Sequence, residues 1–162
     1  MTVDSATPSV TVRAASGSVR AVALVLPGGK ADSLDPTSHG QLTAVRMRPF
    51  AAALHRRGAA LGLEVRSLRY RVRGWNGPQM SPVEDARWAL DEIRAAYGAV
   101  PVALVGHSMG GRAAMRVAGA SEVVSVVGLA PWLPAEDPVR QLAGRRVLIA
   151  HGALDFVTSP RA

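Results

Sequence analysis

The sequence predicts one α/β domain, a three-layer α/β/α sandwich built on a mostly parallel sheet. Short apolar runs bounded by turn residues, typical of strands buried on both faces, alternate along the chain with segments of helical apolar spacing. The chain has 162 residues, of which 48% are hydrophobic, and this is enough for one hydrophobic core. Because no repeat or low-complexity linker divides it, we expect a single domain over residues 1–162, with residues 1–17 as a frayed start.

Six apolar runs are expected to form the strands, and they cover residues 10–14, 19–26, 63–72, 100–105, 123–130 and 146–150. Between them, helical spacing predicts helices over residues 42–58, 81–97, 108–119 and 138–142, and a loop over residues 73–82. Strands that alternate with helices favour a parallel sheet with helices on both faces.

The clearest helix begins near Ser81. Ser81 is the expected N-cap, with Pro82 at the first helical position and Glu84 three residues after the serine, which is the capping-box arrangement. Gly98 is the expected stop. The apolar residues of this segment recur at helical spacing and predict its buried face: Val83, Ala86, Leu90, Ile93 and Tyr97.

Composition excludes several classes of protein. The chain has no cysteine, which rules out a disulfide framework, a thiolate metal site and a cysteine nucleophile. No apolar stretch approaches the roughly 20 residues of a transmembrane helix, and the first residues lack the order of a signal peptide. We therefore expect a cytoplasmic protein with no membrane partner.

The net charge of +7 comes almost entirely from arginine, and Lys30 is the only lysine. One cluster stands out, Arg66, Arg69, Arg71 and Arg73, which either contacts an acidic substrate or phosphate or forms a solvated edge of a strand and loop. Nucleic-acid binding would require a motif or interleaved aromatic residues besides charge, and aromatic residues make up only 4% of the chain. No nucleic-acid partner is expected.

The most informative segment is residues 106–111, with the sequence GHSMGG. It follows a predicted strand and opens a predicted helix, so its G-x-S-x-G pattern has the context of a nucleophile elbow. In such an elbow a tight, strained turn lifts the hydroxyl of Ser108 above the carboxyl edge of the sheet, and the flanking glycines let strand and helix approach. The alternative is a glycine-rich turn that arose by chance.

Pro27, Gly28 and Gly29 end the earlier strand at residues 19–26, where a hydrolase elbow needs the loop that supplies an oxyanion-binding amide. The alternative is an ordinary strand-to-loop turn. The amides at the start of the helix after Ser108 also point toward a developing oxyanion.

Together with HGALD at residues 151–155, the segments LPGG and GHSMGG resemble the α/β-hydrolase family in order and spacing, from Val19 to the end of the chain. The similarity is closest to small bacterial esterases and dienelactone-hydrolase-like members. The resemblance implies Ser108 as nucleophile and Asp155 as triad acid, with oxyanion amides from Met109 and from Gly28 or Gly29, and neither cofactor nor metal. An N-cap or turn aspartate is the alternative for Asp155.

One departure from the family pattern concerns the triad histidine. The family order is serine, acid, histidine, and ordinary element lengths would place the histidine about 25–35 residues after the acid. Seven residues follow Asp155 and none is histidine, and of the four histidines only His39 lies on a loop with freedom to reach the site. We therefore expect a chain truncated before its base, with severely reduced turnover and an uncovered strand edge at residues 146–150 that favours self-association.

Fifteen residues separate Ala130 from Arg146, too few for the lid domain that this family often inserts there, so an open site is expected. Trp75 and Trp132 are candidate walls for an apolar acyl or ring group, or are ordinary core or surface tryptophans. The leading interpretation is a serine hydrolase acting on a small ester-like or acyl substrate. The rival is a non-catalytic binding module, or a fragment completed by a partner chain that carries the last strand and histidine.

Overall fold

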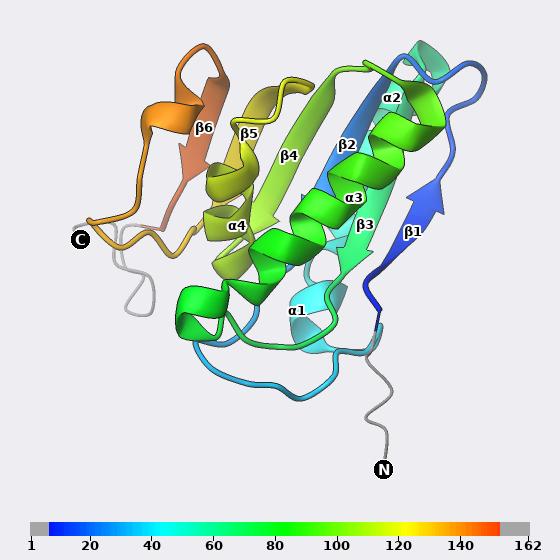
Figure 1. Cartoon of the computed structure of the whole chain (residues 1–162). Helices are drawn as coiled ribbons and strands as arrows, with labels where there is room; N and C mark the ends of the chain where they lie inside the picture. Colours follow the sequence, from blue (N-terminus) through cyan, green and yellow to red (C-terminus); the bar gives the residue numbers. More distant parts are fainter. Residues whose placement is uncertain (1–6, 153–162) are drawn as a thin grey trace.

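A six-stranded sheet organises the computed structural model, which describes residues 7–152 (Figure 1). The strand order is β1-β3-β2-β4-β5-β6, and every pairing is parallel except that of β1 with β3. The strands are β1 (Ser9–Arg13), β2 (Ala21–Leu26), β3 (Leu63–Arg69), β4 (Val102–His107), β5 (Val123–Leu129) and β6 (Arg146–Ala150). All six predicted strands and the mostly parallel sheet are confirmed.

Helices cover both faces of this sheet, with α3 and α4 in front and α2 behind in the view of Figure 1. The elements are α1 (Leu42–Val45), α2 (Arg48–Gly58), α3 (Ser81–Tyr97), α4 (Met109–Val117) and three short 3₁₀ turns, η1 (Ala59–Leu61), η2 (Gly77–Gln79) and η3 (Arg140–Leu142). Across residues 7–152, no helix is long and apolar enough to cross a bilayer.

Two helix predictions were wrong in extent. The predicted helix over residues 42–58 is split into α1 and α2, and Pro49 explains the break because it has no N–H to donate to the Val45 carbonyl of a continuous helix. Pro49 fits instead in the first turn of α2. The predicted helix over residues 138–142 is only the turn η3.

The capping box at Ser81 was also wrong. Met80 occupies the N-cap position of α3 with a left-handed backbone (φ 45°), and Ser81 is the first helical residue. The Ser81 hydroxyl accepts a hydrogen bond from Asn76 Nδ2 at 3.2 Å, while the Glu84 carboxylate pairs with Arg71 at 2.8 Å. Both side chains therefore bind neighbouring segments instead of capping the helix.

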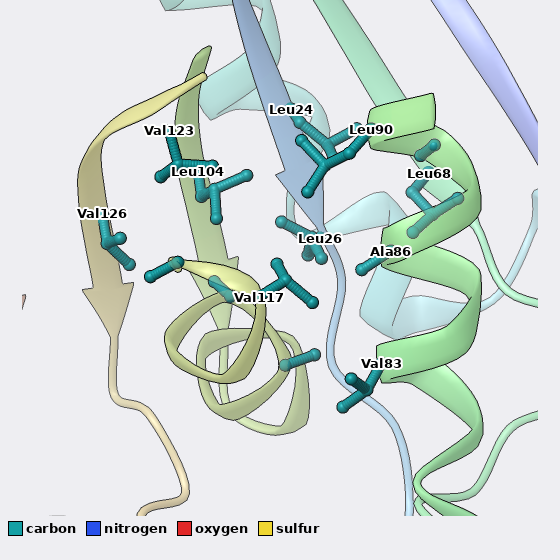
Figure 2. Packing of buried hydrophobic residues seen from close by; sticks show 14 of the residues in the cluster. Leu24, Leu26, Leu68, Val83, Ala86, Leu90, Leu104, Val117, Val123 and Val126 are labelled. Carbon is teal, nitrogen blue, oxygen red and sulfur yellow. The ribbon is translucent and has the colours of Figure 1, made fainter. Parts of the chain in front are cut away.

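The apolar stripe of α3 packs where it was predicted to pack. Ala86 and Leu90 lie over Leu24 and Leu26 of β2, and α4 packs beside them on the same face (Figure 2). Ile93 and Val83 are also buried, whereas Tyr97 at the end of the helix is 36% exposed. Gly98 ends α3 with φ 68°, as expected for a helix stop.

The opposite face of the sheet is covered by α2. Ala23 and Val25 of β2 alternate with the residues that face α3, and they pack with Met47 and Ala51. The three-layer prediction is thereby confirmed for the described residues.

In the cluster Arg66, Arg69, Arg71 and Arg73, two arginines pair with carboxylates, so a solvated edge was the wrong description for Arg66 and Arg71. Arg66 is only 8% exposed, with its Nε 2.7 Å from Glu64 Oε1 and its guanidinium over the Tyr97 ring. Arg71 donates from its backbone N–H and its Nε to the buried carboxylate of Asp85. Burial raises the pKa of Asp85, and the bonds from Arg71 oppose this effect.

Candidate active site

Ser108 lies in the one-residue turn between β4 and α4. Its backbone has φ 52° and ψ −118°, a conformation that L residues rarely adopt and that costs of order 1–3 kcal/mol. Three hydrogen bonds hold it there: its N–H donates to the Leu129 carbonyl at 3.0 Å, and its carbonyl accepts from the N–H groups of Arg112 and Trp132, both at 3.2 Å. The residue is partly exposed at the carboxyl edge of the sheet. This is the strained turn that the sequence predicted.

The glycines of the motif allow three backbone segments to approach one another. A Cβ on Gly106 would meet the backbone of Gly110 and lie 2.6 Å from the Gly111 nitrogen. A Cβ on Gly110 would meet the Leu26 and Pro27 carbonyls, with the Leu26 carbonyl carbon at 2.7 Å. The strands β2 and β4 and the helix α4 thus meet at a distance that no side chain permits.

The Pro27–Gly29 segment reaches the elbow, as predicted. A Cβ on Gly28 would lie 3.5 Å from the Ser108 Cβ and 3.1 Å from His107 Nδ1. Gly29 lies against the Arg73 carbonyl and the side chain of the buried Met109. The backbone that follows β2 and the first residue of α4 therefore flank Ser108. Their role in binding an oxyanion stays a prediction.

The segment proposed to carry the triad acid starts on the same edge. β5 pairs with β6 so that Leu129 lies opposite Ala150, and the Ala130 N–H donates to the Ala150 carbonyl at 2.7 Å. His151 follows directly. Asp155 itself lies outside the described residues, and its role as the acid stays a prediction.

The family assignment rests on nearly the whole chain. The sequence profile of a family described as the alpha/beta hydrolase family matches residues 11–161. The chain belongs to the alpha/beta hydrolase family. Its β4–Ser108–α4 turn and the following β5 and β6 occur in the order that the family resemblance implied, and the protein is a hydrolase by this membership. No curated protein sequence matches the chain.

Solved structures show the same fold. An alpha/beta serine hydrolase homologue from Coxiella burnetii has 19% identity and a TM-score of 0.66, over 95% of this chain and 72% of its own. A serine hydrolase without a lid from Xanthomonas campestris has 19% identity and a TM-score of 0.62, over 95% and 69%. A carboxyl esterase from Bacillus coagulans, in complex with glycerol, has 14% identity and a TM-score of 0.54, over 76% and 39%.

In this hydrolase, Trp75 and Trp132 enclose an arginine. The Arg112 guanidinium lies 4.0 Å from the Trp75 ring centroid and 4.5 Å from that of Trp132, and the two rings meet edge to face at 6.1 Å. Trp75 is 4% exposed, and Trp132 is partly buried. Their proposed second role as substrate walls stays a prediction.

Arg112 also forms an ion pair with Asp137, which the sequence did not predict. Its Nε and a terminal nitrogen donate to the two carboxylate oxygens of Asp137 at 2.6 and 2.9 Å, and Arg116 adds a third bond at 2.5 Å. Burial favours the neutral carboxyl, but the bonds from Arg112 and Arg116 outweigh it and hold the pKa of Asp137 below its ordinary value. An arginine within the small-residue helix was the one available signal, since a buried arginine requires an anionic partner.

The histidines within residues 7–152 differ in their position relative to Ser108 and in their contacts. His55 lies on α2, with its Nε2 3.0 Å from the Ala14 carbonyl, and this contact ties it to the segment after β1. His39 is exposed on the loop before α1, and its carbonyl accepts from Arg48 at 2.9 Å. His107 immediately precedes Ser108. Within residues 7–152, no three metal-ligating side chains gather into a cluster able to hold a metal ion.

Proposed function

We propose that this hydrolase uses Ser108 as a nucleophile on a small ester-like or acyl substrate. The Ser108 oxygen attacks the carbonyl carbon and expels the leaving group, and water then hydrolyses the acyl-enzyme. Amides of Met109 and of Gly28 or Gly29 bind the developing oxyanion. The observation that supports this most is the positive φ of Ser108 in a turn bordered by glycine backbone, because strain of this kind at a serine is costly without a function.

Access to Ser108 is proposed to be direct. The segment between β5 and β6 forms only the turn η3, and its start at Pro131 and Trp132 packs back against the elbow. A lid domain does not fit into so short a connection, and the Xanthomonas relative is likewise a hydrolase without a lid. Small substrates should therefore reach the hydroxyl without an opening step.

We further propose that Asp155 orients a histidine and that neither His55 nor His107 is that base. His55 is engaged with the Ala14 carbonyl, and His107 directly precedes the nucleophile on the sharp turn, where its side chain is turned toward Gly28. Where no histidine reaches Ser108, the serine keeps its proton and turnover is severely reduced. The oxyanion site and substrate binding alone leave about 10³–10⁴-fold catalysis over water in hydrolases that have lost one triad member.

Labelling with a fluorophosphonate tests both statements. The full chain is incubated with the probe, the modified residue is identified by peptide mass spectrometry, and Ser108→Ala is the control. We expect modification of Ser108 and none in S108A. If no histidine of the chain reaches Ser108, the modification is slow and its rate rises with added imidazole, because free imidazole then acts as the base.

Each outcome has a defined meaning. Fast, stoichiometric labelling without imidazole would show that a base is present in the chain. A probe that never modifies Ser108, with or without imidazole, would refute the nucleophile assignment and favour the non-catalytic binding module. Rescue by a co-purifying partner instead of imidazole would identify a fragment completed by another chain.

Self-association is proposed through β6. This strand is the last of the sheet within residues 7–152, and Val147, Leu148 and Ile149 are 42%, 60% and 49% exposed. A two-fold axis through Leu148 would pair β6 with β6 of a second copy in antiparallel register and place Arg146 opposite Ala150. That register pairs the free backbone groups of β6, places the apolar side chains of the two strands next to one another and keeps the two Arg146 charges apart.

A further inference from the structure

A small hollow opens beside the proposed oxyanion loop. Its volume is about 210 Å³ and its lining includes Gly28 and Gly29 together with residues that follow β3 and precede α2. Three of the lining side chains are cationic, Lys30, Arg69 and Arg73, and within residues 7–152 no lining residue is acidic. Ser108 itself does not line the hollow, but Gly28 does, and a Cβ on Gly28 would lie 3.5 Å from the Ser108 Cβ.

A second hollow of about 220 Å³ adjoins the first and shares Pro27 and Arg69 with it. It adds two further arginines, Arg13 and Arg48, together with His39, and the described part of the chain contributes no carboxylate to its lining. Positive charge is thus concentrated around the two adjoining hollows. Their low-dielectric walls strengthen the electric field of these cations.

The two arginines of the first hollow bind neutral oxygens. Arg73 Nε donates to the Pro36 carbonyl at 3.1 Å, and Arg69 donates to Ser9 Oγ at 2.8 Å and to the Thr7 carbonyl at 3.0 Å. By contrast, Arg66, Arg71, Arg94, Arg112 and Arg116 each pair with a carboxylate.

Two carboxylates lie on the loop that borders this hollow, Asp32 and Asp35. Neither lines the hollow, and Asp35 Oδ2 accepts a hydrogen bond from Ser33 Oγ at 3.1 Å. The Gln41 side-chain oxygen accepts hydrogen bonds from Arg73 Nε and, at 3.3 Å, from a terminal nitrogen of Arg73, so this partner of Arg73 is also a neutral oxygen. The described lining therefore leaves the charge of the hollow without a neutralising carboxylate.

We propose that this hollow is the subsite for an anionic group of the substrate, a carboxylate or phosphate carried by the ester. This inference rests on the proposed function of Ser108. Arg73 and Lys30 bind the anion, since a guanidinium offers forked donors and an ammonium offers a compact charge. The glycine backbone at Gly28 and Gly29 then presents the ester carbonyl to Ser108, so the substrate is a short acidic ester.

Binding without turnover tests the proposal separately from catalysis. Two amides of the same skeleton are titrated into the ¹⁵N-labelled full chain, succinamate with one carboxylate and succinamide with none. We expect succinamate to shift the amide signals of Gly28 and Gly29 and to bind at least about tenfold more tightly than succinamide, with a difference that shrinks as salt is added.

The variants are Lys30→Gln, Arg73→Gln and their combination. Each should lose a large part of the preference for succinamate, and the double variant should bind both amides within about a factor of two. Lys30 is exposed and its side chain forms no hydrogen bond or ion pair within residues 7–152, so K30Q should not disturb folding. Arg56→Gln, an exposed arginine of α2 outside both hollows, removes the same charge and is the matched control.

Equal binding of the two amides, or a preference that survives K30Q and the double variant, would overturn the subsite. A loss of preference in R56Q as large as in K30Q would also overturn it, because the effect would then reflect net charge alone. A chain that binds succinamate at Gly28 but never reacts with fluorophosphonate would keep the subsite and refute the role of Ser108.

Discussion

Gly110→Ala tests the closest backbone contact of the nucleophile elbow. The new Cβ would stand 2.7 Å from the Leu26 carbonyl carbon and must reach about 3.4 Å, the lower bound of ordinary contact. The atoms it meets are backbone carbonyls at the end of β2, which cannot rotate away, so α4 has to move relative to the sheet. Overpacking of this kind costs about 1–3 kcal/mol, and alanine returns up to about 1 kcal/mol of helix propensity. We expect a net loss of about 2 kcal/mol in the free energy of unfolding.

The assay is urea unfolding followed by tryptophan fluorescence, together with thermal unfolding and fluorophosphonate labelling of Ser108. A loss of about 2 kcal/mol lowers Tm by roughly 4–8 °C in a chain of this size. Gly119→Ala is the control, because its Cβ would meet only the Gln141 Cβ at 3.3 Å. If G110A unfolds at the same urea concentration as the natural chain, or if G119A is equally destabilised, the close approach of β2 and α4 does not explain the glycine.

The contacts around the site support three further predictions. Gly28→Ala should cost little stability, since only the His107 side chain, with Nδ1 3.1 Å from the new Cβ, would have to shift by a few tenths of an ångström. It should nevertheless slow Ser108 labelling about a hundredfold, because the methyl group lies 3.5 Å from the Ser108 Cβ, on the proposed oxyanion side. Asp137→Asn should lower the free energy of unfolding by about 1.5 kcal/mol at pH 7, measured by urea unfolding. The folded pKa of Asp137 is lowered, so its stabilisation is present above about pH 4, is lost as pH falls through the folded pKa, and should be missing from the pH profile of D137N. Leu148→Lys should abolish concentration-dependent dimers in light scattering, whereas Leu34→Lys, at a similarly exposed loop position, should not; dimers that persist in L148K would rule out pairing through β6.

The sheet was predictable because its strands are continuous apolar runs, and the elbow was predictable because G-x-S-x-G has few other uses between a strand and a helix. The start of α3 was not. The Asn76 side chain reaches Ser81 and the Ser33 backbone, and these contacts hold Met80 in a left-handed conformation that no local propensity favours. The contacts of Asn76 with Ser33 and Ser81 thus prevented the capping box that the local sequence at Ser81 and Glu84 predicts.

The ion-pair partners of the arginines could not be predicted from the sequence either. The positions of Arg71, just after β3, and of Arg112 on α4 could be read from the sequence, but their partners Asp85 and Asp137 lie 14 and 25 residues away along the chain. A charge pattern predicts that partners exist and not which ones, because pairing depends on how the elements pack. The described residues around Arg73 in the hollow include no carboxylate, and the sequence could not show this because the lining residues come from separate segments of the chain.

The contacts around Arg112 give Trp132 a positioning role that does not depend on substrate. The backbone N–H of Trp132 donates to the Ser108 carbonyl, and the Trp132 ring lies against the Arg112 guanidinium. Arg112 in turn bonds Asp137, which belongs to the same β5–β6 connection as Trp132. The β5–β6 connection therefore holds the strained backbone of Ser108. The same connection is bound to α4, the helix that follows Ser108, through the Asp137–Arg112 ion pair.

If this closed set of contacts maintains the strain, Arg112→Lys should slow Ser108 labelling even though Ser108, Met109 and Gly28 are untouched. Lysine keeps the positive charge but loses the forked donors to Asp137 and the planar contact with the Trp132 ring. Arg145→Lys is the matched control, because Arg145 lies on the β5–β6 connection and bonds the Ala118 and Ala120 carbonyls, away from Ser108. A labelling rate in R112K equal to that of R145K and of the natural chain would show that the turn keeps its strain without the Arg112 contacts.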